Sequence, residues 1–249
     1  MQSDNKRMYV MIVLPIHNEE AIIERAVVQL HSHCTATLAD MHWTIVIADN
    51  GSTDASEDII KRIALGYPNI LYDARTPPGR GGALQQAWSL FDADVYVYMD
   101  CDLATDLRYL RECIDAIMRN KYDIAIGSRL VTGSCAHRSV LRTACSYMYS
   151  IVPRLFFPSF PIRDCQCGFK AISHRTKKEL LPRVQDQYWF FDTELLIRGH
   201  YANYRIMEMP VWWKDQRFAQ RKSKVRLIHT ALGNIAKLFE LKKNPDLRR

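Results

Sequence analysis

Two carboxylates follow an apolar run near the middle of the chain. Residues 95–99 have the composition of a buried strand, and Asp100 and Asp102 come directly after it, one residue apart. Because side chains at i and i+2 of an extended segment point the same way, the pair can converge on one hard cation. Oxygen ligands select Mg²⁺ or Mn²⁺, which usually keep open positions for substrate phosphates. Asp is also common in turns after strands for conformational reasons alone, so the pair needs support from other residues.

Polar groups follow two further apolar runs. Glu19 comes after residues 9–14, and Asp49 and Asn50 come after residues 44–48. Any one such group is the ordinary polarity of a loop. Several of them at the carboxyl ends of parallel strands predict a binding crevice, because that edge is where open α/β sheets bind ligands.

A glycine-rich stretch adds a cation. Residues 79–82 read Gly-Arg-Gly-Gly, and Arg80 there could hold a phosphate, although a glycine run is also simply a loop. No G-x-G-x-x-G follows the first apolar run, and the sequence contains no G-x-x-x-x-G-K-[ST]. These absences argue against a dinucleotide oxidoreductase and a P-loop enzyme.

Strands that alternate with helices must position these groups. In the first half, short apolar runs alternate with segments of helical spacing, which predicts an α/β fold with a mostly parallel sheet and helices on both faces. We expect strands at 9–14, 44–48, 70–72, 95–99 and 123–127, and helices at 20–38, 55–65, 82–91 and 107–120. The second half breaks this rhythm. There we expect helices at 139–157 (interrupted by Pro153), 192–201 and 225–243, a strand at 169–173, and a strand pair at 204–209 and 211–213.

Composition bounds the class of protein. The chain has 249 residues, of which 48% are hydrophobic, and no linker is evident, so we predict one domain over 1–249 with halves 1–130 and 131–249. Seven cysteines without framework spacing predict free thiols in a reducing cytoplasm. The first residues are polar and no run of 18 uncharged apolar residues occurs, so we predict neither a secretory signal nor a transmembrane helix.

The net charge of +7 and a pI near 9.0 admit nucleic acid, an anionic membrane or a polyanionic small molecule as partner. Near the C-terminus, apolar residues at helical spacing adjoin a basic cluster: Val225, Ile228, Leu232, Ile235 and Phe239. Such a helix can lie on a membrane surface, or it can pack on the core with a solvated basic face. An aromatic stretch could form an interfacial lip, although such stripes more often belong to a core: Tyr147, Tyr149, Phe156, Phe157 and Phe160.

Six motifs occur in the order of a known family. They are Val13 to Glu20, Asp49 to Asp54, Asp100 to Asp102, Gly127 to Arg129, Arg163 to Lys170 and Trp189 to Leu196. Together they resemble family 2 glycosyltransferases of the Rossmann-like GT-A fold. The last two look like the polyprenyl-phosphate branch, which includes dolichol-phosphate mannose synthase and dolichyl-phosphate glucosyltransferase.

The resemblance implies a role for each matching residue. The first half would bind the nucleotide sugar, and the second half would face the acceptor and carry the terminal amphipathic basic helix. Asp100 and Asp102 would hold the Mg²⁺ or Mn²⁺ ion and, with Arg129 and Lys224, would be catalytic. The nucleotide-sugar site would comprise these four residues together with Pro15, His17, Glu19, Ala48, Asp49, Asn50, Arg80, Cys101 and Arg217. The acceptor phosphate would meet Arg138, Arg142, Asp164 and Asp192.

The implied reaction is inverting, metal-dependent transfer of a hexose from UDP-glucose or GDP-mannose to a polyprenyl or dolichyl phosphate, at the cytoplasmic face of a membrane. A phosphate nucleophile is already anionic and needs cationic positioning, whereas a hydroxyl acceptor needs a base, for which Asp164 or Asp192 could serve. We expect peripheral membrane association or recruitment by a membrane-anchoring subunit.

Three alternatives differ in partner. The same fold could act on a glycan or another hydroxyl acceptor. Asn50 stands where the family commonly has Asp, so a donor-binding protein that has lost turnover is a further reading. A non-catalytic basic module would bind nucleic acid, but it leaves the carboxylates at the strand ends unexplained. We therefore expect no nucleic-acid partner.

Overall fold

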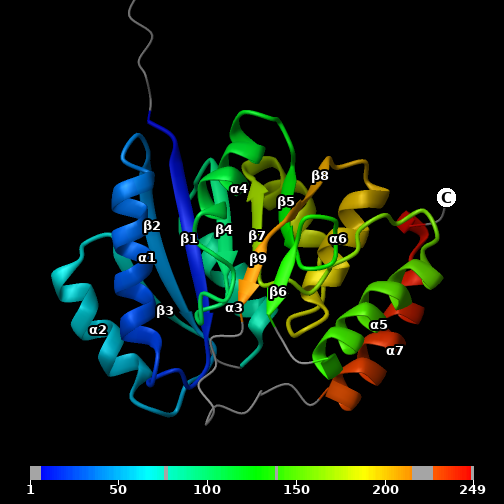
Figure 1. Ribbon diagram of the computed structural model, residues 1–249, viewed down its shortest axis with the longest axis horizontal. Coiled ribbons are helices and arrows are strands. Elements are labelled where there is room, and N and C mark those ends of the chain that lie inside the picture. The colour runs from blue at the N-terminus through cyan, green and yellow to red at the C-terminus, as the bar shows by residue number, and fades with distance from the viewer. Residues whose placement is uncertain (1–6, 76–77, 138–139, 215–226, 248–249) are drawn as a thin grey trace, which may run out of the picture.

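The computed structural model describes residues 7–75, 78–137, 140–214 and 227–247, with only the backbone described at 140–146 and 227–232. A central sheet crosses the molecule with helices on both faces (Figure 1). Its order is β3-β2-β1-β4-β7-β5-β8. The strands of this sheet are β1 (Tyr9–Ile16), β2 (His42–Asp49), β3 (Ile70–Ala74), β4 (Val95–Met99), β5 (Ile124–Ser128), β7 (Phe169–Ser173) and β8 (Ile206–Pro210). The predicted α/β fold with a mostly parallel sheet is confirmed.

The described helices connect and cover these strands. They are α1 (Ile23–Thr37), α2 (Ser56–Gly66), α3 (Arg80–Ser89), α4 (Tyr109–Met118), α5 (Val140–Phe156), α6 (Phe191–Tyr201) and α7 (Leu227–Lys243), with the short turns η1 (Thr176–Leu180), η2 (Leu181–Arg183) and η3 (Pro245–Leu247). Every helix that the structure describes falls short of the length and hydrophobicity that a bilayer crossing requires.

Strand direction determines which loops meet. β1 pairs in parallel with β2 and β4, while β7 runs antiparallel between β4 and β5. β5 therefore runs in the same direction as β4. The residues after β1, β2, β4 and β5 consequently lie at one edge of the sheet, and so do the residues just before β7.

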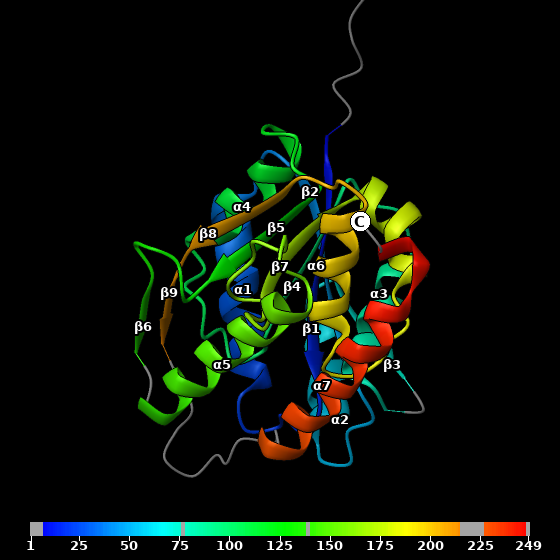
Figure 2. The ribbon, with the colours of Figure 1, turned by 90° about the vertical axis from the view of Figure 1, so that its right-hand side faces the viewer.

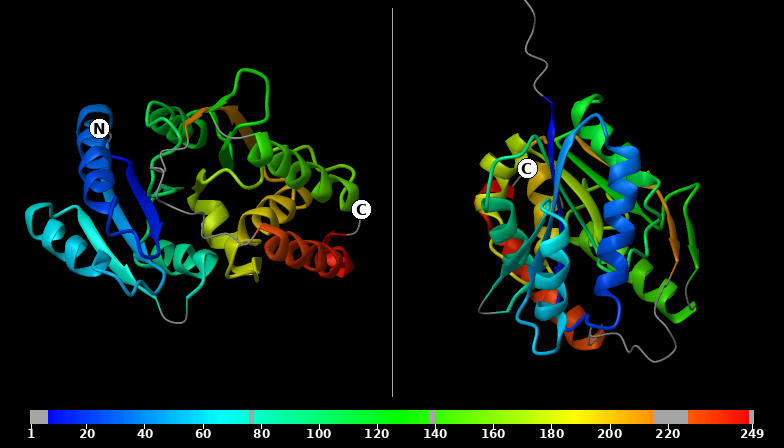
Figure 3. Two further views of the ribbon diagram at one scale, coloured as in Figure 1. Left: turned by 60° about the horizontal axis from the view of Figure 1, so that its bottom comes forward. Right: turned by 90° about the vertical axis from the view of Figure 1, so that its left-hand side faces the viewer.

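Alternation along the strands fills a core on each face of the sheet. On β1, Val10 and Ile12 pack in the cluster under α1, α2 and α4, whereas Met11 and Val13 pack in the cluster under α3 and α6. Figures 2 and 3 show these two helical layers from further sides. Both faces are covered, which explains why the parallel strands read as continuous apolar runs.

The end of the sheet departs from one expectation. We expected residues 204–209 and 211–213 to pair with each other. Instead, β8 joins the main sheet beside β5, while β9 (Trp212–Lys214) pairs in parallel with β6 (Cys135–His137). The chain leaves the main sheet at Pro210, the last residue of β8, and the short β9 follows almost at once, which leaves no loop to form a hairpin.

Two further expectations concern α5 and α7, which lie side by side (Figure 2) with the Phe156 and Phe239 rings 4.5 Å apart. Pro153 does not interrupt α5, which runs on to Phe156. Because Pro153 stands near the carboxyl end of the helix, the bond lost through its missing N–H costs little continuity. Of the aromatic residues that could form a lip or belong to a core, Phe157 and Phe160 are buried in the core, whereas Tyr147 is exposed.

Candidate active site

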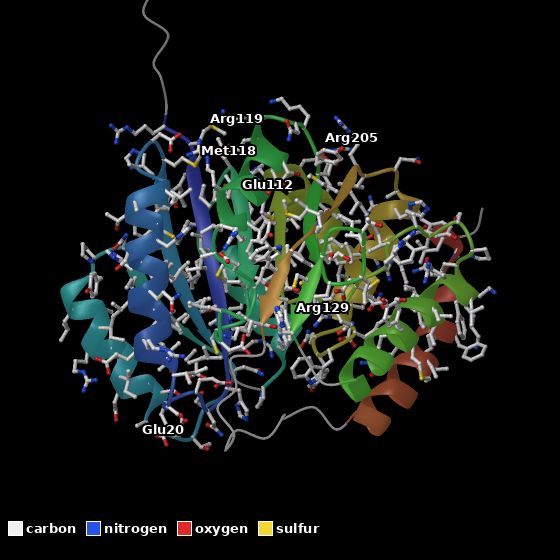
Figure 4. All side chains as sticks on the ribbon, viewed as in Figure 1. Glu20, Glu112, Met118, Arg119, Arg129 and Arg205 are labelled. Atoms are coloured by element: carbon white, nitrogen blue, oxygen red, sulfur yellow. The ribbon has the colours of Figure 1, made fainter. Side chains whose placement is uncertain are left out.

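The sequence-predicted polar residues gather at the carboxyl edge of the sheet. Figure 4 shows Glu20 and Arg129 toward this edge, whereas Arg119 and Arg205 lie at the opposite one. Arg119 caps the end of α4, and Arg205 immediately precedes β8. The residues predicted to bind a ligand thus lie at the edge opposite to Arg119 and Arg205.

The corner formed by β1 and β2 holds the first group. Pro15 and Ala48 are neighbours in register, and Asp49 ends β2 as a buried residue. The Asp49 carboxylate accepts hydrogen bonds from the Ser52 N–H and the Tyr72 hydroxyl, both at 2.8 Å. Burial and the neighbouring Asp49 raise the pKa of Tyr72. The carboxylate thus shapes the loop after β2.

Asn50 joins this corner to α3. Its Oδ1 accepts a hydrogen bond from the Gly79 N–H, and its carbonyl oxygen lies 3.1 Å from His17 Nδ1. Glu19 is buried nearby, with its N–H donating to Ser56 Oγ at 2.9 Å. The loops after β1 and β2 and the amino end of α3 therefore form one connected wall.

The Asp pair lies in a turn beyond β4. The strand ends at Met99, and the Leu103 N–H donates to the Asp100 carbonyl at 3.0 Å, so Asp100 and Asp102 do not continue the extended strand that we expected. The positive φ of Leu103 (49°) completes the turn, and the Ala104 N–H donates to Asp102 Oδ1 at 3.1 Å. Both carboxylates still lie at the carboxyl edge.

Gly168 leaves room for the first of these carboxylates. A Cβ at Gly168 would lie 2.0 Å from Asp100 Oδ2, and the Asp100 N–H donates to the Gly168 carbonyl at 2.9 Å. The Asp100 side chain remains 47% exposed. Among the described residues, no three His, Cys, Asp or Glu side chains gather as a complete metal site. Two carboxylates without a third do fit a cation that draws its other ligands from substrate phosphates and water.

Arg80, the first residue of α3, joins two carboxylates. Its Nη2 donates to Asp100 Oδ1 at 2.8 Å, and its Nη1 donates to Asp192 Oδ2 at 2.7 Å. The guanidinium carbon lies 5.1 Å from the centre of the Tyr98 ring and 5.4 Å from that of Trp189. Arg80 is thus a bridge between the β4 turn and α6.

A fully buried lysine, Lys170, forms an ion pair with Asp192. Lys170 Nζ lies 3.0 Å from Asp192 Oδ1, and it donates to the Tyr98 hydroxyl at 3.0 Å and to the Cys167 carbonyl at 2.6 Å. The Tyr98 hydroxyl also donates to Asp192. Burial alone would raise the pKa of Asp192, but the charges of Lys170 and Arg80 outweigh it and hold that pKa below its usual range.

Arg129 and Asp164 form a second buried pair. Arg129 Nε and Nη2 donate to the two Asp164 oxygens at 2.7 and 2.8 Å, and the Arg129 N–H donates to the same carboxylate at 2.9 Å. Burial would raise the pKa of Asp164, yet Arg129 lowers it. A small open cavity lies beside the pair, lined by Arg129, Tyr149, Ser150, Arg163, Asp164, Cys165 and Gln166.

Some sequence-predicted residues cannot be compared with the structure. Arg138, Arg217 and Lys224 lie outside the described residues, and Arg142 lies in α5 where only the backbone is described. Cys101 belongs to the turn after β4 and is buried. The sequence reasoning gave no role to Lys170, Tyr98 and Trp189, although Lys170 and Trp189 belong to two of the motifs. A lysine between Phe169 and Ala171 in an apolar strand was a usable signal, because a buried ammonium requires a partner.

The sequence resembles known glycosyltransferases over most of its length. The sequence profile described as "Glycosyl transferase family 2" matches residues 11–181. Glycosyltransferase AglD of Haloferax volcanii is 36% identical over 225 residues, which are 90% of this chain but only 35% of the relative's length. The dolichyl-phosphate beta-glucosyltransferase of Saccharomyces cerevisiae is 26% identical over 85% of this chain and 69% of its own length. The dolichol-phosphate mannosyltransferase of Pyrococcus furiosus is 27% identical over 94% and 64%.

Solved structures share the fold at low sequence identity. Glucosyl-3-phosphoglycerate synthase from Mycobacterium tuberculosis, in complex with Mn²⁺, UDP and phosphoglyceric acid, superposes with a TM-score of 0.72 at 17% identity, covering 96% of this chain and 80% of that one. The mannosyltransferase PcManGT from Pyrobaculum calidifontis, in complex with GDP-Man and Mn²⁺, has a TM-score of 0.57 at 18% identity over 87% and 59%. These likenesses concern the fold alone.

Proposed function

Because this chain belongs to glycosyl transferase family 2, we propose that it transfers glucose or mannose from a nucleotide sugar to a polyprenyl phosphate, with inversion at the anomeric carbon. The names of several relatives support a dolichyl-phosphate acceptor. The donor would be UDP-glucose or GDP-mannose, the nucleotide sugars that two solved structures of this fold hold together with Mn²⁺.

The partners and pKa values of the two candidate bases, Asp164 and Asp192, support one class of acceptor over the other. Asp164 is held by Arg129, and Asp192 is held by Arg80, Lys170 and Tyr98, so both carboxylates are engaged by donors and have lowered pKa values. A general base for a hydroxyl works best with a raised pKa near the operating pH. A phosphate acceptor arrives already ionised and needs no such base. This favours polyprenyl phosphate over a glycan hydroxyl.

The acceptor phosphate would bind in the cavity beside Arg129. Arg129 and Arg163 line it, together with Asp164, the buried partner of Arg129. Because Asp164 holds the guanidinium by two hydrogen bonds, the remaining N–H groups of Arg129 need not reorganise as the reaction proceeds. Arg138 and Arg142 stay predicted as further contacts of this phosphate.

The reaction then needs positioning more than proton transfer. An oxygen of the acceptor phosphate forms a bond to the anomeric carbon of the sugar as the bond from that carbon to the diphosphate oxygen breaks, and the nucleoside diphosphate leaves with the electron pair. Asp100 and Asp102 would hold a Mg²⁺ or Mn²⁺ ion, which supplies charge neutralisation for the leaving diphosphate when bound. The wall formed by Pro15, Asp49 and Asn50 would face the nucleoside.

An exposed apolar face suits an acceptor embedded in a membrane. Tyr147, Met148, Ile151 and Leu155 are exposed at spacings that share one side of α5, and the exposed Phe239 of α7 lies against Phe156 at the end of the same helix. On α7, Leu238 and Leu241 pack into the core, so α7 itself is mainly a packing helix in its described part. We therefore place the membrane contact on α5 and Phe239, at the cytoplasmic face, with or without an anchoring subunit.

The deciding experiment is release of nucleoside diphosphate from UDP-glucose and from GDP-mannose, with Mn²⁺ or Mg²⁺, in the presence and absence of a short polyprenyl phosphate. Release from one donor that requires the lipid, and is lost in Asp102→Ala, is the expected result. Release that depends on an added sugar acceptor and ignores the lipid would replace polyprenyl phosphate with a glycan acceptor.

A further inference from the structure

Arg80 is held in a fixed position at the amino end of α3. A Cβ at Gly79 would lie 2.7 Å from the Gln187 carbonyl oxygen, and a Cβ at Gly81 would lie 2.6 Å from Phe191 Cβ. Side chains at either position would push α3 away from the segment that leads into α6. The two glycines therefore bring α3 against this segment and determine where the guanidinium of Arg80 lies.

The two ends of the Arg80 guanidinium are not equivalent. Its Asp192 partner is buried, and Lys170 and the Tyr98 hydroxyl meet the other carboxylate oxygen, so loss of Arg80 would leave Asp192 Oδ2 in the core without its cationic donor. Its Asp100 partner is 47% exposed, in a setting where an ion pair contributes little to stability. The contact with Asp192 therefore fixes the position of Arg80, whereas the contact with Asp100 can be exchanged for another partner.

The two aromatic rings near Arg80 reinforce this asymmetry. The guanidinium lies over both rings, of which Tyr98 is fully buried and Trp189 is 39% exposed. A cation over two aromatic rings gains from both without needing the exposed carboxylate. Nη2 of Arg80 can therefore change partner while the rest of the side chain keeps its place.

We propose that Arg80 is the resident counter-cation of Asp100 and exchanges this carboxylate for the diphosphate of the donor when a divalent cation takes its place. The inference rests on the proposed function, since it uses Asp100 as a ligand of that cation. Two positive groups at one carboxylate repel each other, so Arg80 weakens cation binding while the site lacks nucleotide. The diphosphate offers Nη2 a new acceptor and removes the conflict.

Arg80 thereby couples two ligands. Because coupling between ligands is reciprocal, the nucleotide strengthens cation binding by the same factor by which the cation strengthens nucleotide binding. Arg80 is in this sense a positioning residue that makes donor and cation bind together.

The test compares wild type with Arg80→Gln by electron paramagnetic resonance of free Mn²⁺, without lipid, and then with UDP, GDP or the matching nucleosides. Arg80→Gln should bind Mn²⁺ alone roughly tenfold more tightly, as removal of one nearby unit charge implies. The enhancement of Mn²⁺ binding by nucleoside diphosphate should shrink, and uridine or guanosine should leave Mn²⁺ binding unchanged in both proteins. Arg62→Gln, which removes an exposed charge paired with Glu24, should match wild type.

Equal or weaker Mn²⁺ affinity in an Arg80→Gln protein that melts like wild type would overturn the proposal, as would absence of Mn²⁺ binding in both proteins. Arg80→Lys keeps one charge but cannot bridge both carboxylates, so an intermediate affinity is expected if the glutamine variant does not fold. An Arg80→Lys affinity equal to that of wild type would also contradict the exchange. Because no acceptor is present, a failed lipid transfer assay and a failed Mn²⁺ result remain separate outcomes.

Discussion

Lys170 and Asp192 form an ion pair in the core, with 3.0 Å between Nζ and Oδ1 and neither side chain appreciably exposed. Lys170 comes from the middle of β7, and Asp192 from the first turn of α6. The pair connects the sheet to the helix that supports Arg80 and the candidate donor site. Its energetics therefore bear on both stability and function.

Removal of one member of this pair should be costly. Asp192→Asn should lower the free energy of unfolding by about 3 kcal/mol, because the Lys170 ammonium would lose its charged partner in the core. Urea denaturation measures this value. Lys170→Met combined with Asp192→Asn should cost less than the sum of the single changes, and strict additivity would show that the two charges are not coupled.

Acid should destabilise the fold by protonating buried carboxylates that form ion pairs. The folded pKa values of Asp164 and Asp192 lie below the unfolded value of about 3.9, so both carboxylates stabilise the fold above that pH. This stabilisation is lost as pH falls through the lowered folded pKa values. Chemical denaturation between about pH 5 and pH 2 should show the decline. An Asp164→Asn protein should show a shallower decline, and an unchanged slope would argue against a lowered Asp164 pKa.

Gly168→Ala should impair the candidate metal site. Its Cβ would meet Asp100 Oδ2 at 2.0 Å, so the carboxylate must move away from its position in the turn. We expect a loss of about a hundredfold in transfer rate, comparable to other displacements near 1 Å. Gly66→Ala is the matched control, because a Cβ at Gly66 meets nothing within 4 Å. Equal transfer rates for Gly168→Ala and Gly66→Ala would show that transfer does not depend on the position of the Asp100 carboxylate.

Arg129→Lys should weaken use of the acceptor more than use of the donor. Lysine keeps the charge but cannot reproduce the two parallel hydrogen bonds to Asp164, so it would not hold the cavity wall in place. Steady-state kinetics should show a rise in KM for polyprenyl phosphate of about tenfold, the effect of one lost charge-assisted contact. A rise confined to the KM of the nucleotide sugar would instead place Arg129 on the donor.

The apolar face of α5 offers a test of membrane contact. Leu155→Glu should reduce binding to anionic vesicles in a sedimentation assay, because Leu155 is 71% exposed one helical turn after the exposed Ile151. Leu65→Glu is the matched control: Leu65 is 90% exposed on α2. If both variants sediment with vesicles as wild type does, α5 is not the contact surface.

The sequence by itself determined the strands of the main sheet, their alternation with helices, and the edge at which Glu19, Asp49 and Asp100 would meet, although it did not predict β6. These features follow from local periodicity and from the rule that parallel strands end together, so no long-range contact was needed to predict them. The family motifs identified the same residues.

Only the tertiary structure decided which charges pair. Asp192 could serve as a base on sequence grounds, but its partners Arg80 and Tyr98 come from 112 and 94 positions away. Arg129 pairs with Asp164, which is 35 positions away in the chain. Lys170 can pair with Asp192 because β7, which carries Lys170, is inserted antiparallel between β4 and β5. The partner of a buried charge depends on the packing of distant elements, and hydrophobic spacing along the chain carries no record of it.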